Sequence, residues 1–137
     1  VKSIIKDYCL RSENGNLAEH DIMILDTMGE LGKMFAFADV AFIGGSFNKT
    51  GGHNPLEATI FAKPVISGPS IHNFKDIYAI IQNAKAGFVV KTEEALYEVA
   101  DKLFSDNEFY NATSNAGRKV FKDQQGALEF VVNVLKQ

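Results

Sequence analysis

The chain has 137 residues, of which 46% are hydrophobic and 23% charged, as in a single globular domain. Its 17 acidic and 14 basic residues give a net charge of −3 without a basic stripe, so we expect no nucleic-acid partner. The single cysteine excludes an internal disulfide. The most apolar stretch, residues 34–45, is too short to span a bilayer, which takes about 20 residues.

The chain opens on a helical pattern, because Ile4, Ile5 and Tyr8 follow helical spacing. We therefore expect it to begin inside a helix of a longer protein. Four short, continuous apolar runs follow, which is typical of strands buried on both faces of a parallel sheet. These runs cover residues 22–25, 40–43, 64–67 and 87–90.

Helical patterns alternate with these runs. They cover residues 29–38, 54–62, 74–84 and 92–104. The alternation predicts an α/β fold, with a Rossmann-like parallel sheet and flanking helices, and we expect residues 1–137 to form a single domain. A capping-box spacing from Ser105 to Glu108 predicts a further helix ending near Gln124, and Gly126 predicts a break before a last helix.

The segment after the second predicted strand, residues 44–53, contains four glycines and leads into a predicted helix at Asn54–Pro55. Glycines allow a ligand to approach the backbone closely, and a helix N-terminus favours an anion. Ligands of open α/β sheets bind beyond the carboxyl ends of the strands. The segment is therefore a candidate phosphate site, although its glycines equally suit simple turns.

Two carboxylates follow strand ends and have two interpretations each. Glu57 has the spacing of a ribose ligand, but Asn54, Pro55 and Glu57 also match a helix start with a capping box, which the spacing favours. Thr27 and Glu30 have the same box spacing. His53 and Glu57 lack a third ligand at useful spacing, so we expect no metal site.

Several segments together resemble the Kdo transferase family of lipopolysaccharide synthesis. They are residues 21–31 (DIMILDTMGEL), 40–47 (VAFIGGSF), 51–58 (GGHNPLEA), 63–66 (KPVI), 68–69 (GP) and 72–74 (HNF). The resemblance runs from about Leu10 to Gly87 and keeps the order and spacing of the segments.

The resemblance implies the nucleotide-binding, C-terminal part of a GT-B glycosyltransferase, which takes Kdo from CMP-Kdo to a lipid A precursor. The implied CMP-binding residues are Met28, Gly29, Glu30, Asn54, Pro55, Leu56 and Glu57, with Glu57 on the ribose. Further residues implied near the donor are Gly44, Gly45, Ser46, Thr50, Gly52 and His53.

No residue of this chain is implied as the catalytic base, because the resemblance places the base in an N-terminal domain that also holds the lipid acceptor. We therefore expect the chain alone to be inactive. No cofactor or metal is implied. The full-length enzyme is expected at the cytoplasmic face of the inner membrane, whereas this part is expected to be soluble and without membrane contact.

Two other interpretations remain open. One is another GT-B transferase that uses a UDP- or CMP-linked sugar, since a glycine loop followed by a helical glutamate suits many such enzymes. The other is a non-catalytic, flavodoxin-like binding module. Asp26 alone is not the acidic cluster expected of a phospho-accepting domain.

Overall fold

The computed structural model describes residues 6–13 and 19–135. The chain forms two compact units, Val1–Met34 and Phe35–Gln137. The helix predicted at the start lies mostly outside the described residues, and its described end, residues 6–8, is not helical.

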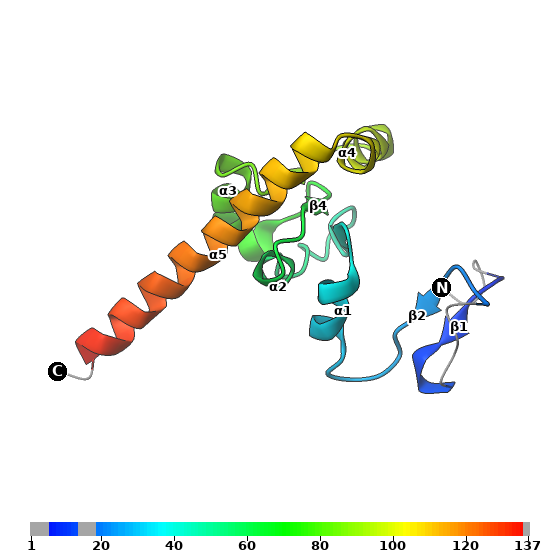
Figure 1. Cartoon of the computed structure of the whole chain (residues 1–137), viewed down its shortest axis with the longest axis horizontal. Coiled ribbons are helices and arrows are strands. Elements are labelled where there is room, and N and C mark those ends of the chain that lie inside the picture. The colour runs from blue at the N-terminus through cyan, green and yellow to red at the C-terminus, as the bar shows by residue number, and fades with distance from the viewer. Residues whose placement is uncertain (1–5, 14–18, 136–137) are drawn as a thin grey trace. The chain divides into compact units, whose positions relative to one another are not determined.

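The first unit contains a small parallel sheet. Strand β1 (Cys9–Leu10) pairs with β2 (Met23–Ile24), so that Cys9 lies opposite Met23. A single 3₁₀ turn, η1 (Arg11–Glu13), follows β1. Strand β2 confirms the apolar run at residues 22–25, whereas β1 was not predicted. Helix α1 (Leu31–Phe37) contains the boundary between the units (Figure 1).

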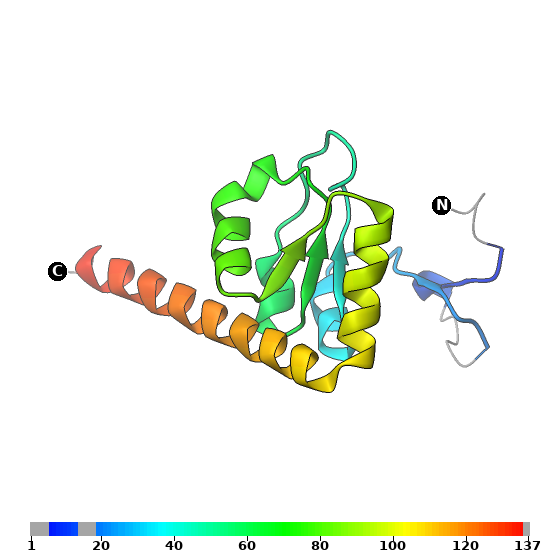
Figure 2. The same ribbon diagram turned by 90° about the horizontal axis from the view of Figure 1, so that it is seen from above.

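The second unit is built on a three-stranded parallel sheet in the order β3-β4-β5 (Figure 2). The strands are β3 (Ala41–Ile43), β4 (Val65–Ser67) and β5 (Gly87–Val89). All three lie within the predicted apolar runs. Val65 lies between Ala41 and Gly87 in the register. The parallel α/β architecture expected from the sequence is therefore confirmed.

Helices cover both faces of this sheet. They are α2 (Leu56–Ile60), α3 (Lys75–Asn83) and α4 (Glu93–Ser105), with a 3₁₀ turn, η2 (His72–Phe74), before α3. Val65 packs with Ala58 of α2 on one face, and Ile66 packs with Leu103 of α4 on the other. Alternate residues of β4 thus face opposite helical layers, which explains why all three residues of this strand, including Ser67, are buried.

The last helix, α5 (Asn107–Leu135), corrects two predictions. It has 29 residues and continues through Gly126, where a break was expected. A glycine inside a helix costs only about 1 kcal/mol relative to alanine, which is too little to end a long helix. The cap is also one residue later than predicted, because the side chain of Asp106 accepts a hydrogen bond from the Phe109 N–H at 2.9 Å.

Helix α5 packs against α2 and α4 and thereby joins the two helical layers (Figure 2). Among the described residues, no helix is both long and apolar enough to cross a membrane.

Candidate functional site

The first unit holds Glu30 in a defined orientation. Arg11 Nη2 lies 3.1 Å from Glu30 Oε1, and the hydroxyl of Thr27 donates a hydrogen bond to Glu30 Oε2. The Thr27 bond, and then the Arg11 charge, lower the pKa of Glu30, although desolvation partly opposes them. Helix α1 starts at Leu31, so Thr27 does not cap it as predicted; the hydroxyl instead bonds the Glu30 carboxylate.

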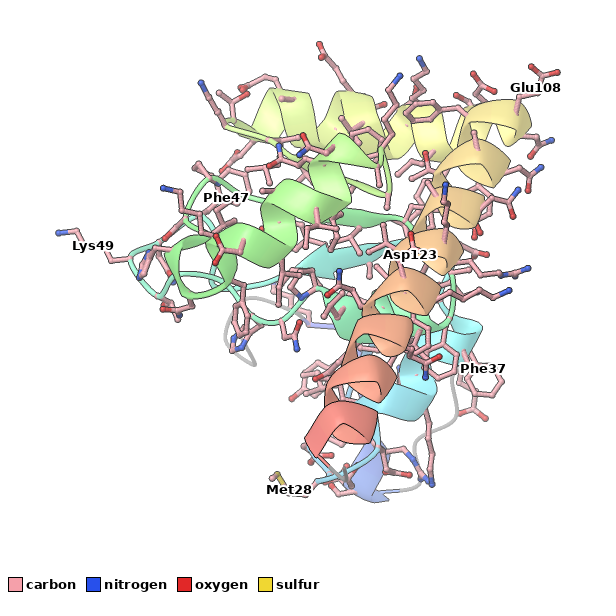
Figure 3. All side chains as sticks on the ribbon, turned by 90° about the vertical axis from the view of Figure 1, so that its left-hand side faces the viewer. Met28, Phe37, Phe47, Lys49, Glu108 and Asp123 are labelled. Carbon is pink, nitrogen blue, oxygen red and sulfur yellow. The ribbon has the colours of Figure 1, made fainter. Side chains whose placement is uncertain are left out.

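Two further predicted residues lie in the turn between Thr27 and Glu30. The side chain of Met28 is 97% exposed and points away from the ribbon (Figure 3). Gly29 has φ +80°, a conformation that strains any residue with a Cβ atom. The turn therefore presents Met28 and the Glu30 carboxylate on a backbone shape that needs glycine.

The glycine loop, which we define as residues 44–53, follows β3 at the carboxyl end of the sheet. Gly45, Gly51 and Gly52 have positive φ, and the Gly52 N–H donates to the Gly45 carbonyl at 3.0 Å. This bond closes the loop across its base and brings the two glycine-rich ends together. The tip is exposed, and Lys49 projects from it (Figure 3).

Ser46 is a buried member of this loop and connects the ends of two strands. Its hydroxyl donates to the Ile43 carbonyl at 2.6 Å and accepts from the Gly68 N–H at 2.8 Å. Its carbonyl accepts from the Ser70 N–H, also at 2.8 Å. Because Ser46 is 1% exposed and its donor is in use, it anchors the first part of the loop to the strand ends.

The residues after the loop form only half of the predicted capping box. Asn54 Oδ1 accepts a hydrogen bond from the Leu56 N–H at 3.0 Å, which confirms its capping role. Pro55 is buried at the start of α2. Glu57 does not reach back: its side chain is exposed, and the carboxylate has no hydrogen-bond or ion-pair partner among the described residues.

Helix α2 has five residues instead of the nine predicted, so its macrodipole adds less to anion binding than expected. The glycine loop is therefore the stronger candidate for a phosphate contact. His53 is exposed, and its carbonyl accepts from the Tyr78 hydroxyl at 3.4 Å. In the part of the chain that the structure describes, no three His, Cys, Asp or Glu residues are grouped to hold a metal ion.

Sequence reasoning missed two side chains that shape these regions. Arg11 directly follows β1, so it stands at a strand end, but a two-residue strand gives no apolar run to reveal this. Asn73 donates its side-chain amide to the Thr50 carbonyl at 2.8 Å across 23 residues of sequence. No local pattern marks such a contact.

The comparisons with known proteins agree with this arrangement. The family model described as "Glycosyl transferases group 1" matches residues 6–120. The 3-deoxy-D-manno-octulosonic acid transferase of Haemophilus influenzae is 38% identical over 128 residues, which cover 92% of this chain and 30% of that protein. The enzyme of the same name from Rickettsia bellii is 35% identical, covering 99% of this chain and 35% of that protein.

A solved structure is similar as well. It is the crystal structure of the C-terminal CMP-Kdo binding domain of WaaA from Acinetobacter baumannii, with a TM-score of 0.77 and 27% identity. The match covers 83% of this chain and 60% of that domain. The chain thus spans about a third of the length of the curated relatives it matches.

Proposed function

Because the chain belongs to the group 1 glycosyl transferases, we propose that it supplies the CMP-binding part of the donor site of a Kdo transferase. The observation that carries this proposal is the similarity to a CMP-Kdo binding domain over 83% of the chain. The names of the sequence relatives support the same sugar. We also propose that both units, residues 1–137, belong to one donor-binding domain.

In this proposal Glu57 accepts hydrogen bonds from the ribose hydroxyls of CMP. Its exposed carboxylate supports this role, because no protein group among the described residues competes for it. The Asn54 side chain is already used, because its Oδ1 accepts a hydrogen bond from the Leu56 N–H at the start of α2. Pro55 and Leu56 are also proposed as CMP contacts, and so, in the first unit, are Met28, Gly29 and Glu30.

The glycine loop is proposed to lie against the phosphate of the donor. When the bond from Kdo to CMP breaks, negative charge builds up on that phosphate. Backbone N–H groups directed at the charge stabilise it most in the transition state. Gly44, Gly45, Thr50, Gly52 and His53 are the candidate loop contacts, and Ser46 anchors the loop to the strand ends.

The rest of the reaction is proposed to depend on the remaining part of a longer protein. That part would bind the lipid A precursor at the cytoplasmic face of the inner membrane and supply the base that deprotonates the acceptor hydroxyl. We accordingly expect no Kdo transfer by this chain alone.

A titration of the isotope-labelled chain with CMP, followed by NMR, tests the proposal. We expect amide shifts at residues 28–30, 44–46 and 50–57. The variant Glu57→Gln should weaken binding about tenfold, since hydrogen bonds to a charged acceptor contribute about 1.5–3 kcal/mol. Glu98→Gln, an equally exposed change on α4, is the matched control and should bind as the parent does.

Two results would contradict the proposal. Equal shifts with UMP and CMP would favour another nucleotide-sugar transferase. No shifts with millimolar CMP, in this chain and again in the longer protein, would leave the site without its proposed ligand.

A further inference from the structure

The turn η2 holds the second half of the glycine loop from outside. Asn73 Nδ2 donates to the Thr50 carbonyl at 2.8 Å, and the Asn73 backbone N–H donates to the Gly51 carbonyl at 3.3 Å. One residue thus fixes two consecutive carbonyl groups of a loop that lies more than 20 positions earlier in the chain.

The contact is close because the loop has a glycine at this point. A Cβ atom added to Gly51 would lie 2.5 Å from His72 Nε2 and 2.7 Å from Asn73 Nδ2. Gly51 also has φ +91°, which residues with a Cβ atom rarely adopt. The side chains of His72 and Asn73 therefore occupy the place where a side chain of residue 51 would stand.

The hydrogen bonds from Asn73 set the direction of one backbone donor, the Gly51 N–H. In a trans peptide the C=O and N–H groups point in opposite directions, and the described residues contain no cis peptide. Since the Thr50 carbonyl faces Asn73, the Gly51 N–H points away from Asn73. It has no hydrogen-bond partner within the described parts of the chain, whereas the next N–H, of Gly52, is bonded to Gly45.

We propose that Asn73 is a positioning residue for the donor site: it holds the Thr50–Gly51 peptide so that the Gly51 N–H can donate to the phosphate of the bound nucleotide. This inference rests on the proposed function. Asn73 itself touches no ligand. Its side chain is exposed, so its bond to Thr50 adds little to global stability and acts mainly on the shape of the loop.

The variant Asn73→Ala tests the role, because it removes the side-chain donor without introducing a charge near the phosphate. We expect the CMP dissociation constant to rise about three- to tenfold, the range for one lost hydrogen bond. The thermal midpoint should stay within about 2 °C, as for an exposed substitution. Amide exchange at Gly52 should become about three- to tenfold faster, because the loop opens more often.

Asn111→Ala, the same change at an exposed position of α5, is the matched control and should alter none of these quantities. If Asn73→Ala binds CMP as tightly as the parent, the positioning role is wrong while the proposed function stands. A thermal midpoint that falls in step with affinity would assign Asn73 to general stability, which also overturns the inference.

If the parent chain does not bind CMP, the proposed function fails in this chain, and amide exchange without ligand decides the positioning role. Faster exchange at Gly52 in Asn73→Ala would support control of the loop by Asn73. Unchanged exchange would overturn it.

Discussion

At the scale of single residues, Glu30 and Glu57 differ in how they are held. Glu30 is bonded on both oxygens, by Arg11 and by Thr27, whereas Glu57 is exposed without a partner among the described residues. The first carboxylate is oriented in advance, and the second is free to accept bonds from a ligand. A carboxylate that is oriented in advance loses less entropy when it binds a ligand, whereas an open acceptor has its bonding capacity unused.

The Thr27–Glu30 bond predicts a measurable titration. The Thr27 hydroxyl is the largest cause of the lowered Glu30 pKa, so Thr27→Val should move that pKa upward. Carbon-detected NMR of the Glu30 carboxyl group over pH 2–7, a range set around the ordinary glutamate pKa of about 4.3, would measure the change. Glu94, whose pKa is lowered by its own backbone N–H and by Thr92, should titrate identically in both proteins.

The sign of the linked stability follows from the direction of this shift. A carboxylate whose folded pKa is lowered stabilises the fold above its ordinary pKa, and this contribution is lost as pH falls through the lowered value. Thr27→Val should therefore reduce the part of the free energy of unfolding that is lost as pH falls through the Glu30 pKa. An unchanged Glu30 titration would show that the hydroxyl does not bond the carboxylate in solution.

Whether the sequence predicts the role of these residues depends on how far apart in the chain the two partners of each contact lie. The Asn54 cap was predicted correctly because it bonds two residues away, within a local pattern. The same pattern wrongly assigned Glu57 to a capping box. Arg11 and Asn73 act across 19 and 23 residues, so only the folded chain reveals them.

At the scale of elements, α2 and α3 end in the same way. The N–H groups of Lys63 and Ala62 donate to the carbonyls of Ala58 and Thr59, respectively. At the end of α3, the N–H groups of Ala86 and Lys85 donate to helix carbonyls in the same way. This is the Schellman arrangement, which requires a left-handed residue at the helix end. Ala62 and Lys85 take that conformation, with φ 55° and 58°, although glycine is usual there.

The variant Lys85→Gly should therefore stabilise the protein by about 0.5–1 kcal/mol. Relief of the left-handed strain, about 1–2 kcal/mol, is partly offset by the greater freedom of glycine in the unfolded chain. Urea denaturation followed by circular dichroism would measure the change. Lys119→Gly, at an exposed site inside α5, should instead destabilise by about 1 kcal/mol. If both changes destabilise the protein, the left-handed conformation of Lys85 at the end of α3 does not carry the expected strain.

The elements that the sequence predicts well are those with continuous apolar runs. Strands β3, β4 and β5 each lie within such a run, and in β4 the neighbouring side chains of Val65 and Ile66 meet different helical layers. Strand β1 has two residues and no run, so it was missed. The break expected at Gly126 was wrong because one unfavourable residue does not outweigh the many favourable residues of a long helix.

At the scale of the whole molecule, burial is uneven between the two units. The three clusters of buried hydrophobic residues found in the described structure all lie in Phe35–Gln137, around Val65, Ile66 and Ile81. In the described part of the first unit, only Cys9 and Leu10 are buried. A two-stranded sheet with so few buried residues is marginal by itself, so the two units should differ in local stability.

Two matched amides test this difference. The Cys9 N–H bonds the Ile22 carbonyl and the Ala41 N–H bonds the Pro64 carbonyl, both at 2.9 Å and both at the start of a parallel strand. The two amide hydrogens make equal hydrogen bonds but lie in units of unequal burial, so they should exchange with solvent at different rates. We expect Ala41 to be protected at least about 100-fold more than Cys9, which corresponds to about 2.8 kcal/mol in opening free energy. Hydrogen exchange followed by NMR, corrected for intrinsic rates, would measure both. Equal protection, falling together as urea is added, would show instead that the two units open as one and that the core around Val65 also stabilises the small sheet.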